Sequence, residues 1–164
     1  MRRPWSERPF EVANLFNPAY CCLILRNVAD GYSTTNKPGL PYALAFLALP
    51  ILLHDPSSVL LPATAKTKLH VWLQQQPEIR VGFVDRVRNT NNFTKEAIFF
   101  GIRHRSLGIS EDGEIESVKK RTKALLWPHE SNQQATLKRA SLVGKLFSQV
   151  NDVSNVFAML GVRP

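Results

Sequence analysis

The stretch Gly39–His54, which reads GLPYALAFLALPILLH, decides how the rest of this chain can fold. It carries no charged side chain before the terminal histidine, and its large apolar residues fall on every side of a helical cylinder. A helix that is apolar all round must be buried on most sides. Because a membrane span needs about 20 apolar residues and Pro50 interrupts this run, we predict the central core helix of a soluble domain.

A second buried helix is predicted just before this stretch. Asn17-Pro18 places a capping residue before a proline at the first helical position, and Gly31 is the usual residue for a left-handed C-cap. We therefore predict a helix over residues 18–30. The two nearly all-apolar helices would form a hairpin core over about residues 9–54.

The next part of the chain, about residues 64–118, predicts three helices followed by a β-hairpin. The helices are expected over 64–76, from Pro77 to the breaker Asn89–Asn92, and over 95–105, where Phe99 and Ile102 would be mostly buried. The hairpin is indicated by short alternating strands around an Asp-Gly turn. This order is that of a winged-helix unit, although order alone is not specific to one.

The C-terminal part, about residues 131–161, predicts two more helices. Ser131 begins a long one that runs to about Val150, and Asp152 caps a short one that ends at Gly161. The whole is expected to be mostly α-helical with a small β-hairpin. A chain of 164 residues closes one good core, so we expect one domain over residues 1–164.

The chain is strongly basic, with 21 Lys and Arg against 13 Asp and Glu and a formal net charge of +8. A basic surface indicates an acidic partner, most often nucleic acid, and the competing interpretation is a plain solvated surface. The middle of the third predicted helix, AIFFGI, has almost nothing to hydrogen-bond a base edge, so contacts would go to phosphates. The candidate nucleic-acid contacts are Arg80, Arg86, Arg88, Lys95, Arg103, Arg105, Lys119, Lys120, Arg121 and Lys123.

No motif in the sequence indicates catalysis. Gly144-Lys145-Leu146 lacks the preceding glycine and the Ser or Thr of a phosphate-binding loop. Cys21 and Cys22 are neighbours in an apolar helix, which is typical of core residues and not of zinc ligands. We expect no enzymatic activity, no metal and no cofactor. The remaining clustered carboxylates sit at the hairpin turn, where we expect plain surface: Glu111, Asp112, Glu114 and Glu116.

Location and assembly are predicted from the same composition. No apolar run follows Arg2 and Arg3, so we expect no signal peptide and a cytoplasmic protein without membrane association. The apolar excess of the two buried helices and of the C-terminal end indicates an interface in addition to the core. The candidate partner-interface residues are Tyr42, Phe46, Leu49, Phe157, Met159 and Leu160.

Several segments carry a resemblance that runs in order over most of the chain. They are RPFEVAN (8–14), NPAY (17–20), GLPYALAF (39–46), LP (61–62), RVGF (80–83), FTKEA (93–97) and LGVRP (160–164). These segments resemble the middle component of three-component ABC systems, the small accessory subunits of Lamassu-type bacterial antiphage operons. The residues that carry the resemblance are packing residues, glycines and prolines, and none of them indicates catalysis.

The resemblance implies a non-enzymatic adaptor in an antiphage or anti-plasmid defence complex. Its partners would be an SMC-like ABC ATPase that senses foreign DNA and an effector, often a nuclease. The subunit would hold the effector inactive or release it, and would meet DNA through the complex.

Two functions of other classes stay open from the residues alone. A free-standing winged-helix DNA-binding protein or transcriptional regulator would bind duplex DNA in isolation, with a steep salt dependence. A metal-dependent nuclease would need the carboxylates of residues 111–116 to converge in a cleft, which a solvated turn does not offer.

Overall fold

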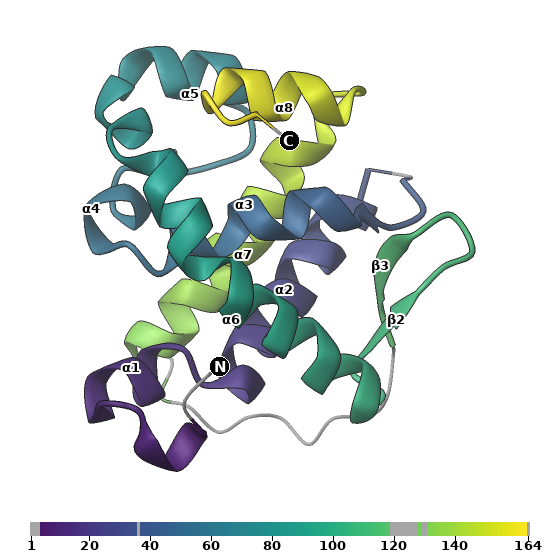
Figure 1. The fold of residues 1–164 in the computed structure, drawn as a ribbon. Coiled ribbons are helices and arrows are strands. Elements are labelled where there is room, and N and C mark those ends of the chain that lie inside the picture. Colours follow the sequence, from purple (N-terminus) through teal and green to yellow (C-terminus); the bar gives the residue numbers. More distant parts are fainter. Residues whose placement is uncertain (1–3, 36, 119–127, 129–130, 164) are drawn as a thin grey trace.

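The computed structural model describes residues 4–35, 37–118, 128 and 131–163. A mostly α-helical fold with a small sheet is confirmed (Figure 1). With η marking a 3-10 helix, its elements are η1 (Trp5–Glu7), α1 (Phe10–Leu15), α2 (Pro18–Ser33), β1 (Leu40–Pro41), α3 (Tyr42–Leu52), α4 (Asp55–Ser58), α5 (Leu69–Gln75), η2 (Pro77–Arg80), α6 (Phe83–Arg103), β2 (Leu107–Ile109), β3 (Glu114–Ser117), α7 (Asn132–Ser148) and α8 (Val153–Met159).

Helix α2 begins where the sequence predicts and continues past its predicted end. Asn17 Oδ1 accepts hydrogen bonds from the backbone N–H groups of Ala19 and Tyr20, at 2.9 and 3.4 Å. Gly31 lies inside the helix, which runs on to Ser33, so its predicted role as C-cap is wrong. Its small size serves packing instead, because a Cβ there would overlap the carbonyl oxygen of Ser141 on α7.

The main partner of α2 is therefore α7, with which it packs more extensively than with α3. A Cβ on Gly144 of α7 would in turn overlap the carbonyl oxygen of Val28. Since Val28 faces Gly144 and Gly31 faces Ser141, the two helices run antiparallel. The predicted hairpin of two helices does not close the core by itself, because α6 and α7 each pack against both of its helices.

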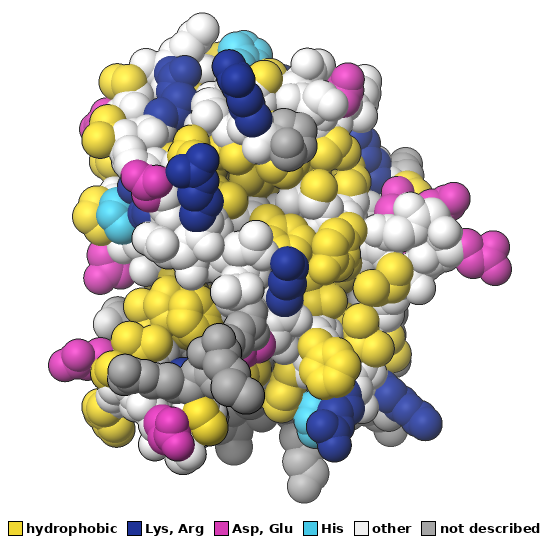
Figure 2. Space-filling model, in the orientation of Figure 1, with side chains coloured by type: hydrophobic (Ala, Val, Ile, Leu, Met, Phe, Trp, Pro, Cys, Tyr) yellow, Lys and Arg dark blue, Asp and Glu magenta, His cyan; other side chains and the backbone are white. Residues whose placement is uncertain are grey.

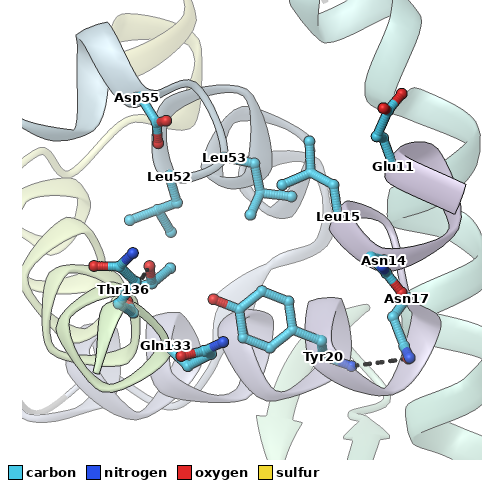
Figure 3. A pocket seen from close by; sticks show the side chains of 11 residues that line it. Glu11, Asn14, Leu15, Asn17, Tyr20, Leu52, Leu53, Asp55, Gln133 and Thr136 are labelled. Atoms are coloured by element: carbon cyan, nitrogen blue, oxygen red, sulfur yellow. Dashed lines mark hydrogen bonds between the residues drawn. The ribbon is translucent and has the colours of Figure 1, made fainter.

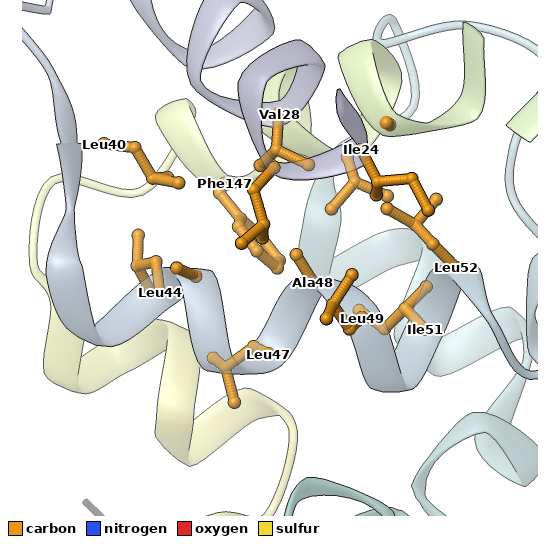
Figure 4. Packing of buried hydrophobic residues seen from close by; sticks show 14 of the residues in the cluster. Ile24, Val28, Leu40, Leu44, Leu47, Ala48, Leu49, Ile51, Leu52 and Phe147 are labelled. Atoms are coloured by element: carbon orange, nitrogen blue, oxygen red, sulfur yellow. The ribbon is translucent and has the colours of Figure 1, made fainter. Parts of the chain in front are cut away.

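Helix α3 is buried, as the sequence predicts for the central helix. Leu44, Leu47, Ala48 and Ile51 are at most 1% exposed. Figure 4 shows Phe147 of α7 lying between α2 and α3. Pro50 lies inside the helix, which continues for two more residues to Leu52. Proline removes one backbone hydrogen bond of the helix, and here that loss falls in its last turn.

Helix α5 starts later than predicted, at Leu69 instead of Thr64. The cause is a long-range contact with Gln149, at the end of α7. Its Oε1 accepts from the Leu69 N–H at 3.0 Å, and its Nε2 donates to the Ala65 carbonyl at 2.6 Å. The side chain thus caps α5 and holds the preceding segment out of helical geometry.

Helix α6 is continuous from Phe83 to Arg103, so the predicted breaker at Asn89–Asn92 is wrong. The buried threonines Thr90 and Thr94 satisfy their hydroxyls within the helix, on the carbonyls of Arg86 and Thr90. The start of the second predicted helix is the separate 3-10 helix η2, and the rest of it forms one helix with the third. The three-helix order of a winged-helix unit is therefore not confirmed.

The predicted hairpin is confirmed and gains a third strand. The sheet is antiparallel with the order β1-β3-β2, and Gly113 supplies the positive φ of 78° in the turn. Leu40 pairs with Ile115, which pairs with Ile109 on its other side. Because β1 runs directly into α3, the sheet fixes the start of the central helix.

The C-terminal helices follow the prediction. Ser131 Oγ accepts from the N–H of Gln134 at 3.2 Å and starts α7. Asp152 Oδ1 accepts from the N–H of Ser154 at 2.8 Å and starts α8. Gly161 has the positive φ of 72° that is typical of a residue after a helix.

Candidate interaction surface

The exposed side of α6 carries apolar side chains where a solvated helix carries polar ones. Phe99 is 67% and Ile102 is 43% exposed. Together with the exposed cations Lys95 and Arg103 they stand at positions i, i+4, i+7 and i+8, which share one side of a helix. This arrangement is a mixed apolar and basic stripe.

The expectation that Phe99 and Ile102 are buried is wrong, and its cause is the helix register. If the helix is taken to start near Lys95, the sequence does not show which of its sides faces the core. When the 3.6-residue period is continued from Phe83, the core-facing positions of the whole helix are fixed, and positions 95, 99 and 102 are not among them. The buried residues of α6 are Phe83, Thr90, Thr94, Ala97, Ile98 and Gly101.

Two more exposed apolar residues lie on the elements beside this stripe. Leu107 of β2 packs against Gly101 of α6, and Ile109, two residues on and on the same sheet face, is 48% exposed. Tyr42 at the start of α3 is 39% exposed, and its ring meets that of Phe46 edge-on at 5.2 Å between centroids.

Hydrophobic side chains gather in a band on this side of the molecule (Figure 2), where α3, α6 and the hairpin come together in Figure 1. Basic side chains lie within and beside the band. We call this surface the α6 face. It consists of Tyr42, Phe46, Phe99, Ile102 and Ile109 with the cations Lys95, Arg103 and Arg105.

The predicted nucleic-acid contacts that lie within the described residues are spread over several elements and do not all belong to one patch. Lys95, Arg103 and Arg105 belong to the α6 face. Arg88 lies on the same side of α6 as Lys95, about two turns nearer the start of the helix, whereas Arg80 lies in η2, before α6. Arg80 donates to the Leu73 carbonyl at 3.2 Å, and Arg88 pairs with Asp85 at 3.6 Å. The remaining predicted run, Lys119, Lys120, Arg121 and Lys123, lies outside the described residues.

Arg86 has a structural position that the sequence does not reveal. Its guanidinium donates to the carbonyls of Ile79 and Val81 at 2.8 and 2.7 Å and lies over the Phe83 ring, 5.4 Å from the centroid. Burial lowers the pKa of Arg86. The side chain fastens η2 to the start of α6, so its hydrogen-bonding capacity is largely used within the chain.

Half of the predicted partner-interface residues lie inside the chain's own core. Leu49, Phe157 and Leu160 are 0%, 6% and 1% exposed, because α8 folds back to pack on α3. Met159 and Phe46 are half-buried. Of that set, Tyr42 with its neighbour Phe46 contributes most to the α6 face.

A polar cleft of about 610 Å³ opens between α1, the start of α2, the end of α3 and the start of α7 (Figure 3). Tyr20 points into it, and burial raises the pKa of its hydroxyl, which hydrogen-bonds Thr136. The charged residues of its lining are Glu11 and Asp55. The described lining offers hydrogen-bond donors and acceptors from the amides, hydroxyls and carboxylates of these residues.

The cysteines are core residues, as the sequence predicts, at 0% and 2% exposed for Cys21 and Cys22. Burial raises the pKa of the Cys21 thiol to about 12 and also raises that of Cys22. Across the described residues, no group of three or more His, Cys, Asp or Glu side chains is placed to hold a metal ion. In the same part of the chain, no helix has the length and apolarity to cross a membrane.

Fold and surface together define a small helical protein whose distinctive feature is an exposed apolar and basic face. Residues 5–164 match the family model described as ABC-three component (ABC-3C) system Middle Component 3, so the chain belongs to this family. Comparison with curated proteins and with solved structures gave no match. Membership of a middle-component family indicates an accessory role beside the other components of such a system.

Proposed function

We propose that this protein is a non-enzymatic adaptor subunit of a Lamassu-type antiphage or anti-plasmid defence complex. Its partners are an SMC-like ABC ATPase and a nuclease-type effector, and the subunit regulates when the effector becomes active. The observation that carries the proposal is the α6 face, an exposed apolar surface on a chain that belongs to a middle-component family.

The energetics support a surface built for assembly. Fully burying one Phe or Ile side chain contributes about 1.5–3 kcal/mol, and the α6 face leaves Phe99, Ile102 and Ile109 between 43% and 67% exposed. Contiguous exposed apolar residues with a polar rim are typical of interaction sites. The proposed complex forms in the cytoplasm and meets DNA through its ATPase.

The proposed subunit is one domain over residues 1–164. Core residues from α2, α3, α6 and α7 belong to one buried cluster, so we expect one cooperative unfolding transition by calorimetry. Two separate transitions would contradict this part of the proposal.

Co-expression with the ABC ATPase and the third component encoded beside it tests the proposal. We expect the three proteins to co-purify and to elute as one complex in size-exclusion chromatography. If this chain eluted alone as a monomer that binds neither component, the proposal would be contradicted. Tight, salt-dependent and sequence-selective binding of duplex DNA by the isolated chain would instead favour a free-standing DNA-binding regulator.

A further inference from the structure

The shape of the α6 face fits a partner helix. Lys95, Phe99, Ile102 and Arg103 follow one side of α6 over about 12 Å of helix axis, at a rise of about 1.5 Å per residue. Tyr42 and Ile109 come from α3 and β2, two elements that contact α6. Apolar positions three and four residues apart are the anchors by which one helix packs on another.

The charges of the face are unbalanced. Among the described residues, Lys95, Arg103 and Arg105 make no ion pair and no side-chain hydrogen bond. The carboxylate nearest in sequence to Lys95 is Glu96, which pairs with Arg8 at 2.8 Å, and the one nearest to Arg105 is Glu111, at the hairpin turn. A partner that covers the apolar centre must therefore meet uncompensated positive charges at the rim.

We propose that the α6 face receives an amphipathic helix with acidic flanks, contributed by the ABC ATPase or the third component. The inference rests on the proposed function and names the partner chemistry of one surface. Apolar residues of that helix cover Phe99, Ile102 and Ile109, and its Asp or Glu side chains meet Lys95, Arg103 and Arg105. Such complementarity fixes orientation and speeds association.

The same features disfavour two other occupants. A second copy of this chain, docked through the same face, would bring the basic rim against itself, and like charges across an interface cost stability. Duplex DNA would place phosphates against Phe99 and Ile102, which offer no hydrogen-bond donor to a phosphate or a base edge.

Photocrosslinking in the assembled complex tests the assignment. Phe99 is replaced by p-benzoylphenylalanine, and the matched control carries it at Val81, which is 72% exposed outside the α6 face. We expect the probe at residue 99 to crosslink a helical segment of the ATPase or third component rich in Asp and Glu. The control position is expected to give at least tenfold less of that product.

Charge reversal supplies a second readout. The double variant K95E/R103E is expected to weaken assembly at least tenfold at 100 mM salt and less at 500 mM salt, because screening removes much of the effect. The control K66E/K68E reverses two exposed lysines in the segment before α5, at the other end of the molecule in Figure 1. It is expected to assemble like the wild type.

Three outcomes would overturn the inference while leaving the proposed function intact. They are an assembled complex in which the probe at residue 99 crosslinks nothing, crosslinks a second copy of this chain, or crosslinks DNA. Unimpaired assembly by K95E/R103E would also overturn it. If the wild-type chain assembled with neither component, both the inference and the proposed function would be contradicted.

Discussion

Gly31 of α2 and Gly144 of α7 each face the backbone of the other helix, and neither position has room for a Cβ. An added methyl group would overlap the carbonyl oxygen of Ser141 in one case and that of Val28 in the other. The obstructing atoms are backbone atoms, which cannot rotate away. The two glycines therefore set how closely the central helices approach.

Gly144→Ala is expected to destabilise the protein by about 3 kcal/mol or more, at the upper end of the cost of overpacking, because the helices must separate. Chemical denaturation followed by circular dichroism measures the loss. Gly108→Ala is the control, since its Cβ would lie 3.6 Å from Val118 Cγ2, an ordinary contact. Equal stability of the two variants would show that α2 and α7 adjust without cost.

The ion pair between Arg8 and Glu96 fastens the N-terminal segment to α6. Two parallel hydrogen bonds of 3.0 and 2.8 Å join them, with side chains only 12% and 21% exposed. These bonds to Glu96 raise the pKa of Arg8. We expect Arg8→Ala to lower the free energy of unfolding by about 1–2 kcal/mol, and Arg8→Lys to recover only part, because an ammonium cannot make the paired fork.

The matched control for that pair is Arg88→Ala. Arg88 and Asp85 are 76% and 77% exposed at 3.6 Å, so the substitution should leave stability nearly unchanged. Limited proteolysis gives a second readout: loss of Arg8 should speed cleavage within the first fifteen residues. A cleavage rate equal to that of the wild type would argue against the fastening role.

His54 should make stability depend on pH. Burial, and then the nearby charge of Arg86, lower its pKa from the ordinary 6.5, and its Nδ1 lies 2.7 Å from Ser57 Oγ. The folded state then binds a proton less readily than the unfolded state. Stability from this group is present above about pH 6.5 and is lost as pH falls through the lower folded pKa.

Urea denaturation at pH 7.5 and pH 5.5 checks this dependence. His54→Asn should lose less stability than the wild type between the two values, whereas His70→Asn, at an exposed position, should behave like the wild type. An identical loss in His54→Asn and wild type would assign the pH dependence to other groups.

Gln149→Ala should release the segment of residues 65–69 from the end of α7. It removes both hydrogen bonds to residues 65 and 69, for an expected cost of about 1–3 kcal/mol. Hydrogen exchange should rise at the Leu69 amide while α7 stays protected. Gln133→Ala, an exposed position at the start of the same helix, is the control.

Most elements could be predicted because their signals are local. Asn17-Pro18, Ser131 and Asp152 each cap a helix with their own side chain, and Gly113 marks the hairpin turn. The predictions that were wrong depend on contacts between residues far apart in sequence. Gln149 is far in sequence from the helix start that it sets, and Gly31 looks like a cap unless its contact with α7 is known.

The candidate surface could be predicted less well than the fold. Nothing in the apolar run around Phe99 distinguishes a core residue from an exposed one until the register of the whole of α6 is fixed. The opposite error affects Leu49, Phe157 and Leu160, whose apolarity indicated an interface and which α3 and α8 bury against each other. Apolar composition alone does not separate the two roles.

Because Cys21 and Cys22 are buried, the surface of the molecule presents no thiol to thiol-reactive reagents. They are the chain's two cysteines, and reagents attack the thiolate, which a pKa of about 12 at Cys21 suppresses at neutral pH. A single cysteine introduced at a surface position would thus be the one addressable group. A fluorophore placed there could report assembly in real time, with both native cysteines left in place.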